Sequence, residues 1–219
     1  MKLEGIILSE TDYKETSKIV NLYTPIGKIG VKALGSKRIK NGLLGFTNTG
    51  NTVEFVATDS SLPTLEEYTI KDSLYTRFDD IKTAKALGVI IRIINDLPPD
   101  TDHKRLYPFV KNVIESLGKF NNDKIISVFL IKILYVFGIA PNLKSCVRCG
   151  CQNDLSFIPE LGGAICKIHG NGDIESLNIW NEYYYNKKKL EEYSDTNFDL
   201  LLNEIKIYYS YHLGFKIKY

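Results

Sequence analysis

The stretch KIVNLYTPIGKIGVKALGSKRIK, residues 18–40, contains two strand-like segments, a tight turn and a basic loop in immediate succession. Residues 18–24 and 29–34 are rich in β-branched and aromatic residues, which favour strands. Between them, Pro25 and Gly27 predict a turn, because proline fixes the first turn dihedral and glycine tolerates positive φ. The stretch therefore predicts two strands joined by a turn and followed by a cationic loop.

Similar short strands are expected on both sides of this stretch. Residues 5–8 begin the series, residues 52–58 place Val53, Phe55 and Ala57 on one face, and residues 68–70 continue the alternation. Five short strands at this spacing suit a small closed barrel. An immunoglobulin-like sandwich would need more strands and more residues.

After residue 79 the apolar period changes from two to between three and four, which indicates amphipathic helices. Helices are expected over residues 81–97, 106–117 and 124–137, and the last is apolar nearly all round. Its apolar run is too short for a membrane span. Two more helices are expected, one over residues 174–185 and a final one that Asp195 or Thr196 caps and Gly214 closes. The fold class is therefore α+β, with several domains.

All four cysteines lie between residues 146 and 166, and His169 follows closely. The pairs Cys146–Cys149 and Cys166–His169 each enclose two residues, a spacing that lets two tight turns aim four ligands at one Zn²⁺ ion. Cys151 is an alternative to Cys149. Four reduced cysteines without a metal, or a disulfide pair, are the other interpretations. A disulfide is disfavoured because the sequence shows no secretory signal and suggests a reducing cytoplasm.

The net charge of +2 does not indicate a nucleic-acid partner, but the distribution of charge does. Five cations fall within 13 residues without an intervening acid, which is typical of a binding face: Lys28, Lys32, Lys37, Arg38 and Lys40. A solvated loop is the alternative interpretation. Residues 81–145 also carry ten basic and five acidic residues, whereas the run from Lys187 to Lys189 resembles an ordinary solvated surface.

Several catalytic motifs are missing from the sequence. It contains no phosphate-binding Gly-x-x-x-x-Gly-Lys loop, no Gly-x-Gly-x-x-Gly turn, no His-Glu-x-x-His pair and no Gly-x-Ser-x-Gly elbow. Of the three histidines, His103 is expected to be exposed and His212 to lie near a helix end. No nucleophile–base pair is evident, so the prediction is a protein that is not an enzyme.

Three motifs give the chain a resemblance to a known family. The first comprises EGIIL (residues 4–8), TDY (11–13) and KIVNLYT (18–24), and the second is ALGSKR (33–38). The most specific is FGIAPNL (137–143) running into Cys146 and Cys149, followed by Phe157, Gly162–Gly163, Cys166 and YHLG (211–214). In these motifs the chain resembles the RecO family of recombination-mediator and DNA-repair proteins, nearly from end to end.

The resemblance implies an oligonucleotide-binding (OB) barrel over residues 1–78 and a helical domain over 79–144 and 176–219. A zinc module over residues 145–175 is inserted in that domain. It also implies binding of single- and double-stranded DNA, annealing of complementary strands, and action with RecR and the single-stranded-DNA-binding protein to load RecA, in the bacterial cytoplasm at the nucleoid. Family members with a metal commonly close the site with a second Cys-x-x-Cys, whereas His169 takes the last position here.

Within this interpretation, the five cations contact DNA, and Cys146, Cys149, Cys166 and His169 hold a structural zinc ion. Tyr13, Tyr23 and Phe46 are candidates for stacking on bases, although the core is an alternative place for each. Three rival functions are a zinc-ribbon regulatory factor, a protein-binding scaffold and, more remotely, a hydrolase.

Overall fold

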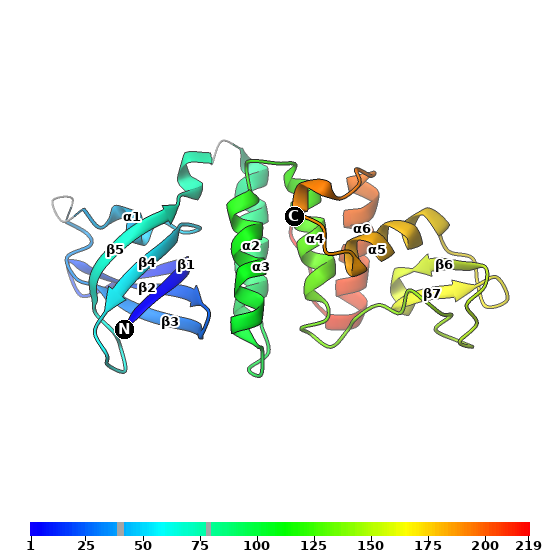
Figure 1. Cartoon of the computed structure of the whole chain (residues 1–219), viewed down its shortest axis with the longest axis horizontal. Helices are drawn as coiled ribbons and strands as arrows, with labels where there is room; N and C mark the ends of the chain where they lie inside the picture. The colour runs from blue at the N-terminus through cyan, green and yellow to red at the C-terminus, as the bar shows by residue number, and fades with distance from the viewer. Residues whose placement is uncertain (39–41, 78–79) are drawn as a thin grey trace. The chain divides into compact units, whose positions relative to one another are not determined.

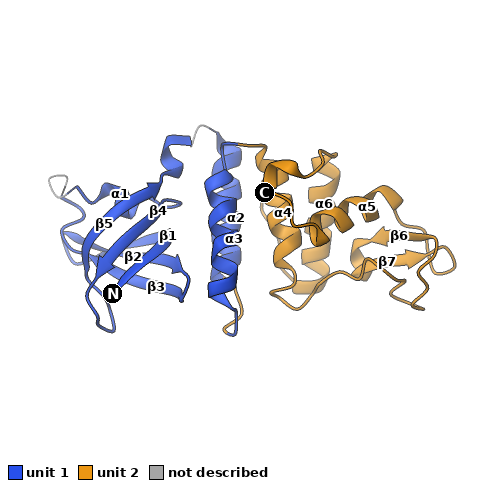
Figure 2. Ribbon diagram, viewed as in Figure 1, with its two compact units in different colours: residues 1–95, 100–119 blue, residues 96–99, 120–219 orange. Residues whose placement is uncertain are grey.

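The computed structural model describes residues 1–38, 42–77 and 80–219, which form two compact units (Figures 1 and 2). One comprises residues 1–95 and 100–119, and the other comprises residues 96–99 and 120–219. The first two long helices therefore group with the N-terminal sheet. The division of the chain at residues 78, 144 and 175 stays a prediction about its functional parts.

The N-terminal sheet has five antiparallel strands in the order β3-β2-β1-β4-β5. They are β1 (Lys2–Tyr13), β2 (Ser17–Thr24), β3 (Gly27–Ala33), β4 (Thr52–Ala57) and β5 (Leu65–Asp72). A parallel bridge from Lys32 to Thr64 joins β3 to the start of β5, and the amide of Lys32 donates to the carbonyl of Pro63 at 2.8 Å. This closing contact, with the short helix α1 (Leu44–Thr47) between β3 and β4, gives the OB topology. The predicted barrel is confirmed.

The barrel interior is filled by alternate residues of its strands. Val20 and Leu22 of β2, Val31 of β3 and Val53 of β4 are fully buried. Phe46 of α1 joins this core, where its ring lies 5.9 Å from that of Phe55 and 5.3 Å from that of Tyr68. The period-two pattern of the strands therefore reflects one apolar interior, as expected for side chains that alternate between faces.

Two helices accompany the barrel in its unit, α2 (Ile81–Asn95) and α3 (His103–Ser116). Near the N-terminus of α3, Nδ1 of His103 lies 3.3 Å from the hydroxyl of Tyr23 on β2, and its ring contacts Gly27 at the start of β3. The expectation that His103 is simply exposed was wrong. It is half-buried because the β2–β3 turn packs on it.

Further along α3, a charged contact fastens the helix to β1. The ammonium of Lys111 donates to both carboxylate oxygens of Glu4 at 2.8 Å, and the hydroxyl of Tyr107 donates to the same carboxylate at 3.1 Å. Burial is the main reason that the pKa of Tyr107 is raised, with a further contribution from the Glu4 charge. The outer surface of β1 and β2 is therefore partly occupied by a helix.

The second unit contains α4 (Asn122–Ile133), α5 (Ile174–Tyr185) and α6 (Phe198–Leu213), with a two-stranded sheet of β6 (Leu155–Ile158) and β7 (Gly163–Cys166). Helix α4 packs against α5 and α6. It ends at Ile133, four residues before the expected end, because its last turn tightens: the amide of Val136 donates to the carbonyl of Ile133. No helix among the described residues is both long enough and apolar enough to cross a membrane.

Candidate metal centre and nucleic-acid interface

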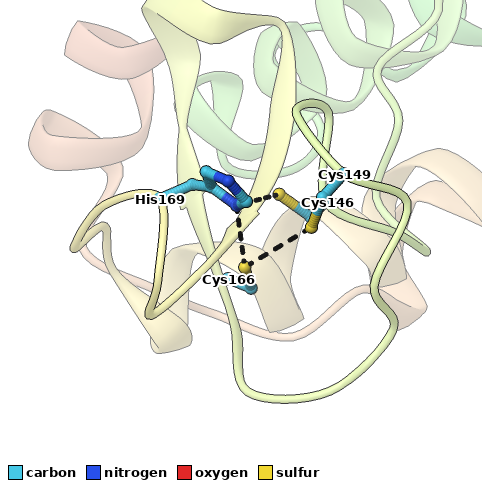
Figure 3. A group of neighbouring side chains, drawn as sticks. All are labelled: Cys146, Cys149, Cys166 and His169. Atoms are coloured by element: carbon cyan, nitrogen blue, oxygen red, sulfur yellow. Dashed lines mark hydrogen bonds between the residues drawn. The ribbon is translucent and has the colours of Figure 1, made fainter.

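The second unit brings together four of the residues that the sequence marks as metal ligands. Figure 3 shows the side chains of Cys146, Cys149, Cys166 and His169 converging on one point. Their ligand atoms, three sulfurs and one ring nitrogen, all lie within 4.8 Å of one another. Residues more than 20 positions apart in the sequence thus meet at a single site.

The spacing of these atoms matches a tetrahedral metal site. The sulfurs of Cys149 and Cys166 are 3.8 Å apart, and Nδ1 of His169 lies 3.3 Å from the sulfur of Cys166 and 3.8 Å from that of Cys146. Around Zn²⁺, metal–sulfur bonds of about 2.3 Å place two sulfurs about 3.8 Å apart, and a sulfur and a nitrogen about 3.6 Å apart. Three soft sulfurs with one imidazole are a donor set that suits zinc.

Two local turns aim these side chains. In the first, which precedes β6, the amide of Gly150 donates to the carbonyl of Cys146 at 2.9 Å, and the amide of Arg148 donates to the Cys146 sulfur at 3.4 Å. In the second, β7 ends at Cys166, and the amide of His169 donates to its carbonyl at 2.9 Å. Each pair of ligands is therefore presented by one tight turn, as the two-residue spacing predicts.

Electrostatics favour the metal-binding form of one thiol. Burial opposes the ionisation of Cys146, but amide donors and the Cys149 thiol together hold the pKa of its thiol at about 6. Since a thiolate is the form that binds metal, the fold prepares this ligand.

Cys151 stands outside the metal cluster. Its sulfur instead accepts the amide of Asn153 at 3.4 Å, in a turn of its own. All four cysteines are free thiols, and the 3.8 Å between the Cys149 and Cys166 sulfurs is far longer than a disulfide bond of about 2.05 Å. The structure therefore supports Cys149 rather than Cys151 as the ligand, and it contains no disulfide.

Close backbone contacts hold the metal module together and join it to the segment that precedes it. Ala164 donates its amide to the carbonyl of Asn142, and a Cβ atom at Gly163 would lie 2.3 Å from that carbonyl oxygen. A Cβ atom at Gly172 would lie 2.2 Å from the carbonyl oxygen of Phe157. Both positions require glycine because the approaching atoms belong to the backbone and have little freedom to move.

The outer surface of β2 and β3 carries two of the five predicted DNA-binding cations. The strand register pairs Lys32 with Ile19, Gly30 with Asn21 and Lys28 with Tyr23, so that Lys28 and Lys32 project from one side of the sheet. The ammonium of Lys28 donates to the carbonyl of Asn95, the last residue of α2, at 2.7 Å. Lys28 thus interacts with the negative end of a helix, whereas Lys32 lies one step closer to the basic loop.

The basic loop after β3 holds the other predicted contacts. Lys37 lies 2.9 Å from the carboxylate of Asp12 on β1, and its hydrogen bond lowers the pKa of that carboxyl. The side chain of Arg38 is exposed. Lys40 lies outside the described residues. The structure thus brings Lys32, Lys37 and Arg38 to the same end of β3, and the assignment of the five residues to DNA stays a prediction.

The two halves of the barrel differ in charge. Residues 13–40, which span β2, β3 and the start of the loop, contain seven basic residues and one acidic residue. Residues 41–72, which span β4 and β5, contain one basic residue and five acidic residues. Glu54 of β4 interacts with both Lys2 and Lys71. The hydrogen bonds from these two lysines lower the pKa of the Glu54 carboxyl to about 2. A polyanion would therefore favour the β2–β3 half.

A small hollow lies beside Lys28 of β3 and Asn95, the last residue of α2. It has a volume of about 180 Å³, and its lining includes Ser9, Asn21 and Gly30 on three adjacent strands. The Asn21 amide donates to the Ser9 hydroxyl at 3.0 Å. The sequence did not reveal this hollow because its lining comes from three strands and from the end of α2, which are far apart along the chain.

Two of the three aromatic residues considered for stacking belong to the core. Tyr23 and Phe46 are both fully buried, so neither ring can receive a base. Tyr13, at the end of β1, is half-exposed, and the ammonium of Lys14 lies 5.3 Å from its ring centre. Of the three, only Tyr13 remains suited to stacking.

Comparison with known proteins finds the same family for both units. The family model "Recombination protein O N terminal" matches residues 1–74, and "Recombination protein O C terminal" matches residues 79–218. Proteins named DNA repair protein RecO are similar over most of their length. The protein from Oceanobacillus iheyensis is 28% identical over 99% of this chain and 90% of its own length. The protein from Bacillus pumilus is 31% identical over 76% and 67%, respectively. The closed OB barrel, the helical unit with its Cys₃His cluster and these matches together show that the chain belongs to the RecO family of DNA repair proteins.

Proposed function

We propose that this protein is a DNA-binding recombination mediator without enzymatic activity. It binds single- and double-stranded DNA, anneals complementary strands, and acts with RecR to load RecA onto DNA coated by single-stranded-DNA-binding protein. Its place of action is the nucleoid. Family membership supports the role in DNA repair, and the names of the related proteins agree with it.

The observation that carries the proposal is the basic half of an OB barrel. Lys32, Lys37 and Arg38 gather at one end of β3, on the side of the barrel that OB folds use for oligonucleotides. Lys28 lies at the beginning of the same strand, and Lys40 belongs to the same run of basic residues in the sequence. Such a strip neutralises phosphates without reading bases, which suits binding that does not depend on sequence.

Annealing follows from the same charge arrangement. Two complementary strands repel each other through their phosphates, and a cationic surface screens that repulsion. If the contacts are made to the backbone, the base edges remain available for pairing. The step needs no nucleotide hydrolysis, in agreement with the lack of a phosphate-binding loop in the sequence.

A zinc ion held by Cys146, Cys149, Cys166 and His169 would have a structural role. Four protein ligands complete a tetrahedral shell, which leaves no position for water or substrate. The ion would join the turn before β6 to the end of β7. Its contribution to function would be the shape of the second unit.

The test compares two variants that each remove two positive charges, one from the basic loop and the other from the surroundings of Glu54. Lys37→Gln/Arg38→Gln alters the basic loop, and Lys2→Gln/Lys71→Gln alters the two lysines beside Glu54. Binding of a fluorescent single strand is measured across a salt series, together with the annealing rate of complementary strands. Each lost phosphate contact should reduce the magnitude of the salt slope by about 0.7.

The proposal predicts weaker binding, a shallower salt slope and slower annealing for the loop variant, with little change for its control. Equal losses in both variants would indicate only a dependence on total charge. Unchanged binding by the loop variant would contradict the proposed interface. Retention of duplex DNA without annealing would favour a zinc-ribbon regulatory factor, and no nucleic-acid affinity even at low salt would favour a scaffold that binds only protein.

A further inference from the structure

A group of exposed aromatic and basic side chains lies in the second unit, where α5 ends. We call it the tyrosine–lysine surface and define it as Tyr135, Lys144, Tyr184, Tyr185 and Lys187. Tyr135 and Tyr185 are 49% and 43% exposed, so both rings are accessible to a ligand. Lys144 and Lys187 are also exposed. None of these residues belongs to the short sequence motifs described above or to the metal cluster.

Several contacts show that the rings form one surface. The ring centres of Tyr184 and Tyr185 are 5.0 Å apart, in an edge-to-face arrangement with an interplanar angle of 84°. The ammonium of Lys144 lies 4.7 Å from the ring centre of Tyr185. Burial raises the pKa of Tyr184, and the neighbouring phenols of Tyr185 and Tyr135 raise it further.

A lysine from α4 supports this surface from below. The ammonium of Lys132 donates to the carbonyls of Tyr184 at 3.3 Å and Asn186 at 2.6 Å, and so fixes the end of α5. Burial lowers the pKa of Lys132, and the nearby charge of Lys187 lowers it further. Positive charge is therefore concentrated where the rings are exposed. The neighbouring cations repel one another.

We propose that the tyrosine–lysine surface binds single-stranded nucleic acid, with bases stacked on Tyr135 and Tyr185 and phosphates held by Lys144 and Lys187. Exposed rings interleaved with cations form the arrangement by which proteins hold single strands without reading their sequence. The cations complement a polyanion, and aromatic faces accept any base. The partner is thus identified by its charge and its stacking surface together.

This inference rests on the proposed function and extends it to a second contact. The basic half of the barrel and the tyrosine–lysine surface belong to different compact units. A protein with two separate single-strand contacts holds two strands at once and raises their local concentration. Annealing would then require both surfaces, whereas binding of one strand would require either.

The test uses photochemical crosslinking to the full-length protein. The probe is an oligothymidylate carrying one 5-iododeoxyuridine, which crosslinks to aromatic side chains that stack on it, and the attached peptides are identified by mass spectrometry. We expect crosslinks at Tyr185 or Tyr135 in the wild type. We expect the same crosslinks in Lys37→Gln/Arg38→Gln, so a failure of the barrel interface remains distinguishable from a failure of this surface.

Binding measurements on three substitutions separate stacking from general stability. Measured in the Lys37→Gln/Arg38→Gln background, in which the barrel contact is weakened, Tyr185→Ala is expected to weaken binding of the oligothymidylate by at least about fivefold, because one stacked base contributes about 1 kcal/mol or more. Tyr185→Phe keeps the ring and should restore the affinity. Tyr75→Ala, which removes another exposed tyrosine, from the first unit, is the matched control and should bind as the wild type does.

Two results would overturn the proposal. One is an oligonucleotide that binds tightly but crosslinks only within residues 1–119, with Tyr185→Ala unchanged in affinity. The other is Tyr185→Ala losing affinity for a fluorescent acidic peptide while keeping its affinity for the oligothymidylate, which would assign the surface to an acidic protein segment instead.

Discussion

The barrel and the metal module reach a stable structure by different means. The barrel buries a continuous apolar interior contributed by four strands and α1, including Val20, Val31, Phe46 and Phe55. The buried cluster of the module is much smaller: Cys146, Ile165 and Cys166, with Cys151, Leu155, Ile158 and Leu161 partly buried against them. Its two strands have four residues each, and an isolated two-stranded sheet is barely stable in water. In the barrel, stability is distributed over many positions, whereas a metal held by the four candidate ligands would supply much of the stability of the module.

The largest expected effect is the loss of one metal ligand. Cys146→Ser should abolish zinc binding and remove the hydrogen-exchange protection of residues 145–173, because structural zinc contributes roughly 10–16 kcal/mol of apparent binding energy in small zinc domains. Protection of the barrel amides should persist. Elemental analysis and hydrogen exchange measure the two outcomes.

Cys151→Ser is the matched control for this experiment, since its sulfur lies outside the cluster. It should retain both the metal and the protection. A wild-type protein without zinc after careful purification, or equal losses in the two variants, would contradict the assignment of the ligands.

The reverse perturbation acts on the barrel. Phe55→Ala should lower the free energy of unfolding of the first unit by about 3–5 kcal/mol, because the side chain is fully surrounded and leaves a cavity. Zinc content should not change. Denaturant unfolding measures the effect, and Tyr75→Ala, at an exposed position, should remain within about 0.5 kcal/mol of the wild type. Release of zinc from Phe55→Ala would show that the barrel and the module do not respond independently.

A smaller effect is expected at Glu204, a buried carboxylate beside the module. It accepts hydrogen bonds from the hydroxyl of Ser176 at 2.6 Å and the indole of Trp180 at 3.0 Å. Glu204→Leu leaves both donors without an acceptor, and should cost about 2 kcal/mol in unfolding free energy. Urea unfolding that finds no loss would show that water reaches these donors.

The pH dependence of Glu204 has a defined sign. Burial raises its pKa in the folded state, so its contribution to stability is fully present below the ordinary glutamate pKa of about 4.3. That contribution is lost as the pH rises through the folded pKa. Glu204→Gln, which stays neutral, should therefore match the wild type in acid and become relatively more stable toward neutral pH. A constant difference between the two across the pH series would contradict this.

The smallest effect concerns Lys28, for which a contribution to the stability of the barrel can be compared with a contribution to DNA binding. Its ammonium interacts with the last carbonyl of α2, a contact that typically contributes about 0.3–1 kcal/mol. Lys28→Gln should lower the stability of the first unit by that amount and affect the salt slope of DNA binding less than Lys37→Gln/Arg38→Gln. A loss of DNA-binding free energy larger than the loss of unfolding free energy would show that Lys28 contacts DNA directly.

Much of the fold could be predicted because its signals are local. The turn at Pro25–Gly27, the alternation in residues 52–58 and the helical period after residue 79 all reflect contacts with near neighbours in the sequence, and the structure confirms them. The four candidate metal ligands were also predictable, since two-residue spacing is a property of single turns.

The remaining features depend on pairings across long distances in the sequence. Nothing local to Glu4 indicates that Lys111 will bind it, and Glu204 reads as an ordinary polar residue of a surface helix until Trp180 meets it. Tyr23 looked available for stacking because the sequence does not reveal which face of a strand a helix will cover. Phe46 did so because the sequence does not show that α1 places this ring in the barrel core.

The imidazole in the metal cluster alters the charge that the second unit presents to a polyanion. Zn²⁺ bound by four thiolates is a dianionic complex, whereas three thiolates with a neutral imidazole in the place of the fourth would give a formal charge of −1. Arg148, exposed in the first ligand-bearing turn, would balance that charge, whereas Lys167 in the second turn already pairs with Asp154 at 3.6 Å. A histidine in the fourth position would thereby leave the module with one negative charge fewer than a fourth cysteine would.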